Sequence, residues 1–131
     1  MGGATDWAAV KLHTLRPGIH LPQVYVYTDA VDFRRGHRGL ASVIEHELGH
    51  DPFSGVLYCF RNRQRNKIKC LFWEDNGFVL YYKALAEERF HWPSGDDELV
   101  TLTGEQMNWL LDGYNLALMQ PHRQLQYESV G

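Results

Sequence analysis

The chain has 131 residues, of which 44% are hydrophobic, so it is long enough to form one domain with a core of its own. Its formal net charge of −3 excludes a uniformly basic coat for nucleic acid, and any attraction to phosphate must come from local clusters of Lys and Arg. We expect a cytoplasmic protein, because no apolar run approaches the roughly 20 residues of a membrane helix and no secretory signal precedes the domain.

Three regions differ in composition. The first twenty or so residues, up to Pro22, contain two prolines and no sustained hydrophobic period. We therefore expect residues 1–20 to form a flexible N-terminal arm. Residues 21–120 should form a single α+β domain, and residues 121–131 a C-terminal tail.

The first half of the domain predicts one strand and one helix. Residues 23–28 are rich in β-branched and aromatic side chains, which favours a strand. An apolar stripe with helical spacing then follows at Leu40, Val43, Ile44 and Leu48. This helix should end near Gly49, because Pro52 disfavours helical geometry at the residue before it.

The second half predicts an antiparallel meander followed by a helix. Residues 56–60 and 68–73 should form a hairpin, and residues 78–82 should add the next strand after the turn-forming residues 75–77. A short strand is expected at 89–92 and extended chain at 99–102. Thr103 and Gln106 form a capping-box pattern, so the second helix should run from there to Gly113. The predicted fold is an α+β domain in which an antiparallel meander packs with two main helices.

Two cysteines, Cys59 and Cys70, are too few for a metal cage. In a reducing cytosol they are better interpreted as small buried apolar residues than as a disulfide. They would face each other if the first hairpin pairs symmetrically.

The segment from His46 to His50 matches the zinc-hydrolase pattern H-E-x-x-H, in which Glu47 would be the general base. The apolar stripe centres near Ile44, so both histidines should point toward water. The helix also ends at His50, and no glycine or third ligand stands where the extended patterns need them. We interpret the two histidines as part of a solvated helix end, where they interact favourably with the helix dipole at its C-terminus. A zinc-dependent hydrolase is the last of the alternatives.

Cations gather in two segments. These are Arg34, Arg35 and Arg38 before the first helix, and Arg61, Arg63, Arg65, Lys67 and Lys69 through the first hairpin. In extended chain the second set would lie on one side, although the turn must disturb that register. Such a ridge is suited to phosphate contact, because each neutralised phosphate releases counterions. The alternatives are a charged hairpin that guards against edge pairing, or one paired with the acidic tract 96–98.

Several stretches together resemble the TnpB-type accessory protein encoded by the second open reading frame of IS66 insertion sequences. They are Asp32-Phe33-Arg34-Arg35-Gly36 with Gly39-Leu40; Asp51-Pro52-Phe53-Ser54-Gly55 with Tyr58, Phe60 and Arg61; Ile68-Lys69-Cys70-Leu71 with Trp73-Glu74 and Gly77-Phe78; and Lys83, Leu85, Phe90 and Trp92-Pro93. The match covers about residues 21–113. Glu88 departs from the family's usual glycine, Ala84 from a common basic residue, and the N-terminal arm is longer.

The resemblance implies a helper in transposition, encoded beside a separate transposase. It supplies no catalytic residues, so we expect no enzyme activity, no cofactor, no metal and no small-molecule substrate. We expect the two basic segments, with all eight cations named above, to bind DNA or the transposase–DNA complex. The alternative is a protein-interaction module of the transposition machinery that makes no direct contact with DNA.

Overall fold

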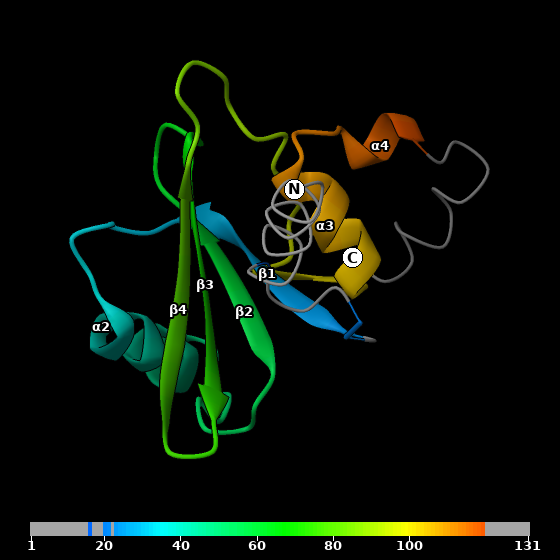
Figure 1. The fold of residues 1–131 in the computed structure, drawn as a ribbon. Coiled ribbons are helices and arrows are strands. Elements are labelled where there is room, and N and C mark those ends of the chain that lie inside the picture. Colours follow the sequence, from blue (N-terminus) through cyan, green and yellow to red (C-terminus); the bar gives the residue numbers. More distant parts are fainter. Residues whose placement is uncertain (1–15, 17–19, 22, 120–131) are drawn as a thin grey trace, which may run out of the picture.

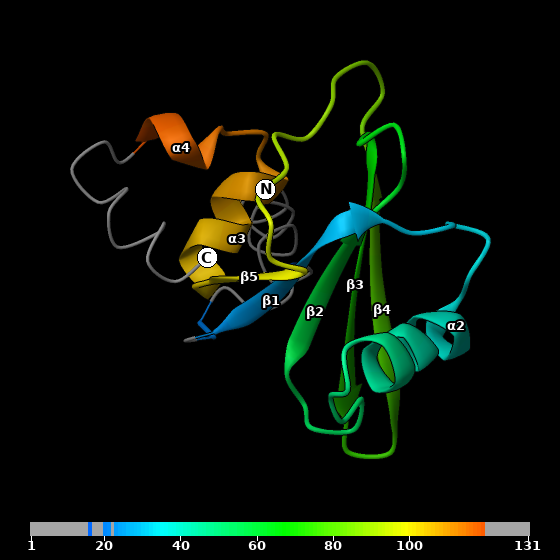
Figure 2. The same cartoon turned by 180° about the vertical axis from the view of Figure 1, so that it is seen from behind.

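Five strands form one mixed sheet that carries helices on both faces (Figure 1; Figure 2). The computed structural model describes residues 16, 20–21 and 23–119, so most of the predicted arm and the whole predicted tail lie outside the described residues. In chain order the elements are β1 (Val24–Ala30), α2 (His37–Ser42), the π-helical segment η1 (Val43–Glu47), β2 (Leu57–Arg61), β3 (Lys67–Glu74), β4 (Gly77–Ala84), β5 (Leu99–Leu102), α3 (Gly104–Leu111) and α4 (Leu116–Met119). None of the described helices has the length and apolar character that crossing a bilayer requires.

The sheet has the strand order β4-β3-β2-β1-β5. Strands β2, β3 and β4 form the expected antiparallel meander. Strand β1 pairs in parallel with β2, with Val24 opposite Leu57, and antiparallel with β5. The α+β domain and its two main helices are confirmed, but the sheet is mixed, because residues 31–56 form a crossover that returns the chain to the same end of the sheet.

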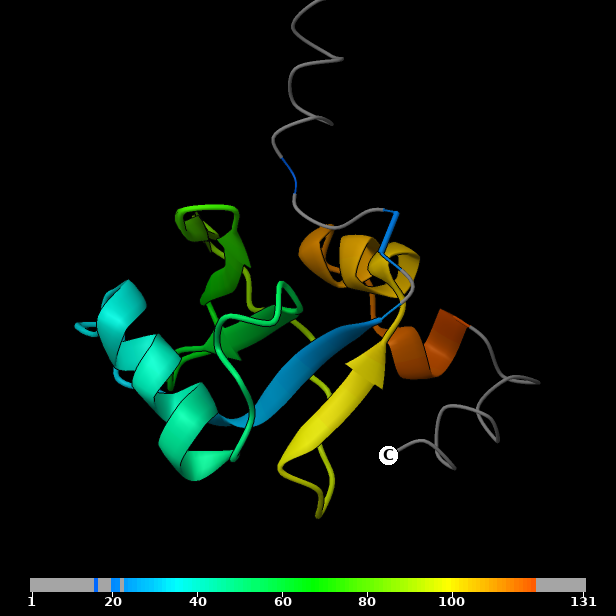
Figure 3. The ribbon, with the colours of Figure 1, turned by 90° about the horizontal axis from the view of Figure 1, so that it is seen from below.

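The two faces of the sheet are buried by different helices (Figure 3). On one face α3 contributes Met107, Leu110 and Leu111 to the larger core. On the other face α2 and η1 cover the sheet with the predicted stripe, and Leu40, Val43 and Ile44 are no more than 1% exposed. Two sets of apolar side chains on alternating strand positions therefore determine the layers of the fold.

The end of the first helical segment and the start of the second follow local sequence signals. Gly49 adopts a φ of +70° directly after the first segment, which confirms the predicted end. The capping box is also confirmed, since the Thr103 hydroxyl accepts a hydrogen bond from Gln106 N at 3.1 Å and Gln106 Oε1 accepts one from Thr103 N at 2.9 Å.

The predicted strand at 89–92 is wrong, because this stretch is irregular. Its aromatic side chains are used for packing instead. Phe90 and Trp92 are buried in the larger core, and Trp92 Nε1 donates to the backbone oxygen of Tyr27 at 2.8 Å. These two side chains therefore anchor an irregular connection across the sheet.

Cys59 and Cys70 face each other across β2 and β3, as symmetric pairing predicted. Their sulfur atoms lie 3.2 Å apart as free thiols, and both side chains are fully buried. Burial raises the pKa of the Cys59 thiol well above its usual value. The pair therefore belongs to the core beside Met107, whose sulfur lies 3.4 Å from Cys59 Sγ.

Candidate nucleic-acid interface

The two basic segments begin at the same end of the sheet because β1 and β2 are parallel. One segment follows β1, and the other begins at Arg61, the last residue of β2. Val31 N donates to the backbone oxygen of Arg61 at 3.0 Å where the two strands end. Parallel pairing thus brings together cations that are about thirty positions apart in sequence.

Lys69 joins the two basic segments. Its ammonium donates hydrogen bonds to the backbone oxygens of Phe33 at 2.9 Å and Arg35 at 2.8 Å. The same nitrogen lies over the rings of Phe33 and Tyr82, at 4.8 and 5.8 Å from their centroids. Burial lowers the Lys69 pKa. Lys69 is therefore a structural anchor of the predicted site, with its donors directed at the protein.

Arg61 is also engaged within the fold. Its Nε donates to the backbone oxygen of Thr28 at 3.1 Å, and a terminal nitrogen donates to that of Asn62 at 3.3 Å. Burial and the nearby charge of Arg65 lower its pKa. The guanidinium consequently ties the end of β2 to β1.

The hairpin cations do not all share one side. In the β2–β3 register Phe60 lies opposite Lys69 and Arg61 lies opposite Ile68. Lys67 and Lys69 therefore lie on the face covered by α2, whereas Arg61 belongs to the opposite face with Ile68. The expected single ridge is wrong for Arg61, because residues 62–66 between the strands reverse the alternation.

The turn between β2 and β3 is organised by the buried side chain of Asn62. Its Oδ1 accepts hydrogen bonds from Asn66 N at 3.1 Å and Lys67 N at 3.0 Å, and its Nδ2 donates to Asn66 Oδ1 at 2.6 Å. Arg65 adopts a φ of 61°, and both Arg63 and Arg65 are exposed. The turn therefore presents two guanidinium groups from a hydrogen-bonded frame.

The segment after β1 is partly neutralised. Arg34 Nε lies 3.0 and 3.1 Å from the two carboxylate oxygens of Asp32, and this contact lowers the Asp32 pKa to about 2. Arg35 is exposed, and its side chain crosses Gly39, where an added Cβ would approach Arg35 Cβ to 2.8 Å. Arg38 is exposed on α2. Its neighbour His37 contacts Phe78, so the first turn of α2 lies toward the far end of β4.

Two acidic side chains lie close to the basic turn. Leu85 N donates to the backbone oxygen of Asn66 at 2.8 Å, and Phe90 N donates to that of Arg65 at 2.7 Å. These contacts hold both ends of the loop that carries the exposed Glu87 and Glu88. The loop held against the basic turn therefore carries two carboxylates and one further exposed cation, Arg89.

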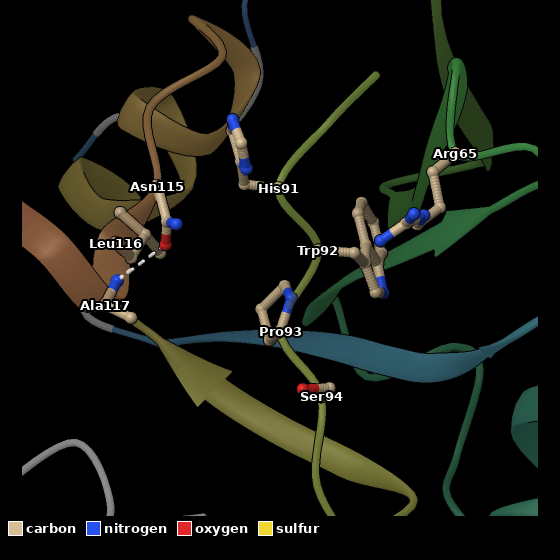
Figure 4. Close-up of a pocket in the computed structure, with 8 residues that line it drawn as sticks. All are labelled: Arg65, His91, Trp92, Pro93, Ser94, Asn115, Leu116 and Ala117. Carbon is tan, nitrogen blue, oxygen red and sulfur yellow. Dashed lines mark hydrogen bonds between the residues drawn. The ribbon is translucent and has the colours of Figure 1, made fainter.

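A hollow of about 290 Å³ adjoins the turn. Figure 4 shows segment 91–94 along it, with α4 on one side and Arg65 reaching toward Trp92 on the other. The Asn115 side chain already accepts a hydrogen bond from Ala117 N at 3.1 Å and begins α4. Arg65 and His91 are exposed here, so the hollow extends the polar surface of the turn.

The H-E-x-x-H residues point in different directions. His46 Nε2 lies 3.0 Å from Glu45 Oε1 on the solvent side, as expected, with the histidine side chain 71% exposed. His50 is half-buried instead of facing water. Gly49 turns the chain back to the sheet, and His50 Nδ1 lies 2.7 Å from the Tyr58 hydroxyl. Glu47 accepts a hydrogen bond from the Tyr27 hydroxyl at 3.2 Å.

A zinc site would need these side chains to converge with a third ligand. Within the described part of the chain, no group of three or more His, Cys, Asp or Glu side chains is arranged to hold a metal ion. The spacing of the pattern assumes an α-helical turn, but here Leu48 N donates to the backbone oxygen of Val43, five residues back.

An exposed aromatic cluster was not predicted from the sequence. The rings of Phe53, Trp73 and Phe78 lie with centroids 5.1 to 5.5 Å apart at the end of the meander opposite the basic turn. Phe53 is 53% exposed, whereas Trp73 and Phe78 are half-buried. The available signal was a phenylalanine within the turn-forming stretch 51–55, where a large apolar side chain has no strand or helix to bury it.

Comparison with known proteins agrees with the resemblance noted in the sequence. The model of the IS66 Orf2-like proteins matches residues 22–121. Two curated proteins of Sinorhizobium fredii, described as uncharacterized proteins y4jC and y4hO, are each 31% identical over 91 residues, or 70% of this chain. The alignments cover 78% and 79% of those relatives. No solved structure matches the chain significantly. The chain belongs to the IS66 Orf2-like family of transposition accessory proteins.

Proposed function

We propose that the chain binds DNA, alone or together with the transposase, through the exposed cations at the β2–β3 turn. The core of this surface is the exposed Arg63 and Arg65 with the half-buried Lys67 beside them, and the exposed Arg35 extends it. The observation that carries the proposal is the Asn62-organised turn, which presents Arg63 and Arg65 to solvent. Among the described residues, neither guanidinium forms an ion pair with a carboxylate.

The eight cations predicted from the sequence then divide by role. Arg61 and Lys69 hold the framework through backbone oxygens, and Arg34 is paired with Asp32. Contact with phosphate by Arg63, Arg65 and Lys67 would release counterions and give a salt-dependent affinity. The net charge of −3 opposes long-range attraction, so we expect weak binding by the isolated chain and stronger binding in the presence of the transposase.

Family membership supports this role. An accessory protein of transposition works beside machinery that already holds DNA, so a local phosphate contact is enough to add affinity or orientation. In this proposal the chain performs no catalysis and takes no cofactor or small-molecule substrate. Its partners are DNA and the transposase of the same element.

The test is fluorescence anisotropy with labelled duplexes from the ends of the element, measured from about 50 to 200 mM salt. Replacement of Arg63, Arg65 and Lys67 by Ala should weaken binding at least about tenfold and flatten the salt slope by about one unit per lost phosphate contact. The charge-preserving variant R63K/R65K should retain most of the affinity. Replacement of Glu87 and Glu88 by Gln should strengthen binding, because it removes the flanking negative charge.

Equal DNA affinity of the triple-alanine variant and the wild type would exclude this surface. A protein-interaction module without DNA contact is the second candidate, and the exposed aromatic cluster around Phe53 favours it. In that case the chain would bind the transposase after nuclease treatment and would show no salt-dependent affinity for element-end DNA.

A further inference from the structure

The aromatic cluster of Phe53, Trp73 and Phe78 lies where the β3–β4 turn meets the loop before β2 (Figure 1). Trp73 and Phe78 are directly opposite each other in the β3–β4 register. The Phe53 ring meets Trp73 edge to face at 5.1 Å and lies 5.5 Å from Phe78. On the helix side His37 closes the cluster, with its ring 6.0 Å from that of Phe78.

Phe53 is held in an exposed position by its own turn. Phe53 N donates to Asp51 Oδ1 at 2.9 Å, and Ser54 N donates to the backbone oxygen of Asp51 at 3.2 Å. Pro52 is buried, and Gly55 adopts a φ of +85°. An exposed aromatic ring on a pre-formed turn loses little conformational entropy when a partner covers it. The fold thus presents a rigid apolar anchor in water.

The exposed charges on the two turns beside this cluster are acidic. Asp51 is exposed beside Phe53, and Asp75 is exposed in the β3–β4 turn. Glu74, the last residue of β3, is exposed on the face opposite to the Trp73 and Phe78 rings. Aromatic ring faces attract Lys and Arg side chains through the ring quadrupole, and nearby carboxylates add to that attraction. An acidic or neutral partner would gain less at this surface, and the phosphate backbone of DNA would be repelled.

We propose that this surface, Phe53 with Trp73, Phe78 and the carboxylates of Asp51 and Asp75, binds a Lys- or Arg-bearing polypeptide segment that inserts an apolar side chain beside Phe53. Charge complementarity selects a cationic segment over a second copy docked through an acidic or apolar face. The proposal rests on the proposed function only in taking the transposase of the same element as the source of the segment.

The two surfaces lie at opposite ends of the meander, so one chain can engage both at once. Lys67, next to the basic turn, pairs with Ala84 at one end of β4, and Glu74 pairs with Gly77 at the other. The chain would then link a basic segment of protein to nearby DNA. Loss of one contact should leave the other intact, which makes the two proposals separable by experiment.

The experiment uses overlapping synthetic peptides of about 15 residues that tile the transposase of the same element, titrated against the full-length chain. Phe53→Ala should weaken the binding of those peptides that bind the wild-type chain about tenfold. Its control is Tyr114→Ala, which truncates an aromatic residue of equal exposure, 52% against 53%, outside the cluster. The charge variant Asp75→Asn should weaken binding about twofold and reduce its salt dependence, whereas Glu74→Gln on the opposite face and E87Q/E88Q should not.

The bound peptides should carry Lys or Arg together with Leu, Ile, Met or an aromatic residue. Absence of any binding peptide, equal binding by the Phe53→Ala variant, or capture of acidic peptides would overturn the proposal. Self-association in sedimentation velocity that Phe53→Ala abolishes would also overturn it, since the occupant would then be a second copy. DNA binding by the Phe53→Ala variant should match the wild type, so a failure here is distinct from a failure at the basic turn.

Discussion

The Lys69 ammonium and the backbone oxygen of Arg35 lie 2.8 Å apart, although 34 residues separate them in the chain. This contact attaches the segment after β1 to strand β3. Lys69, which the sequence placed in a phosphate-binding ridge, therefore directs its ammonium at the protein's own backbone. Position in a basic run does not by itself assign a cation to ligand binding.

Replacement of Lys69 by Met should lower the free energy of unfolding by about 1 to 3 kcal/mol, because two backbone acceptors lose a charged donor. Lys67→Met is the matched control on the same face of β3 and should stay within about 0.5 kcal/mol of the wild type. Urea denaturation followed by tryptophan fluorescence measures both. Equal losses in the two variants would show that Lys69 has no anchoring role.

Asn62→Ala should weaken DNA binding although it removes no charge. Its side chain satisfies Asn66 N and Lys67 N, and without it the turn would lose the frame that positions Arg63 and Arg65. We expect a loss of about 1 to 3 kcal/mol in stability and a several-fold weaker affinity for element-end DNA. Asn76→Ala, at an exposed position of the β3–β4 turn, makes the same substitution away from the basic turn and should change neither strongly. Unaltered DNA affinity in a folded Asn62→Ala variant would contradict the link between turn rigidity and binding.

The two histidines of the H-E-x-x-H pattern should behave differently. His50→Ala removes a hydrogen-bond partner of Tyr58 and should cost about 1 kcal/mol, whereas His46→Ala on the solvent side should cost less than about 0.5 kcal/mol. Thermal melts with and without excess zinc complete the test. A zinc-dependent rise in Tm that both alanine variants abolish would revive a shared metal site.

Alkaline pH should destabilise the fold through two tyrosines. Burial and the Glu47 carboxylate raise the pKa of Tyr27 to about 12, and burial raises that of Tyr58 to about 12, from the usual 10. Both shifts favour the neutral phenol in the folded state, so their stabilisation is complete below pH 10 and is lost as the pH rises from 10 to 12. Urea denaturation at a series of pH values should show a shallower decline for Tyr27→Phe and Tyr58→Phe. A decline as steep as in the wild type would assign the loss to other groups.

Local signals in the sequence predicted the elements well. The stripe of Leu40, Val43 and Ile44 gave the covering helix, and Thr103 with Gln106 gave the start of α3. These features depend on neighbours within one or two turns, so the chain itself carries the information. The pairing of Cys59 with Cys70 could be predicted for the same reason, since a single turn joins their strands.

Long-range relationships could not be predicted in the same way. Parallel pairing of β1 with β2 depends on a crossover whose path no local pattern encodes. Arg61 and Lys69 lie on opposite faces of the sheet because of the number of residues in the turn between β2 and β3. The strand expected at 89–92 was wrong because Phe90 and Trp92 pack into the larger core from an irregular connection. The aromatic cluster was missed because Phe53 meets Trp73 and Phe78, which lie 20 and 25 positions further along the chain.

The mixed sheet also has a consequence for the order in which the molecule assembles. Short turns join β2, β3 and β4, whereas β1 meets β2 only after residues 31–56 have been placed, and it meets β5 across a still longer stretch. Because closing a longer loop costs more chain entropy, we expect the meander to fold first and β1 to dock later. Until that late step Lys69 would remain hydrated, and its desolvation would mark the completion of the native state.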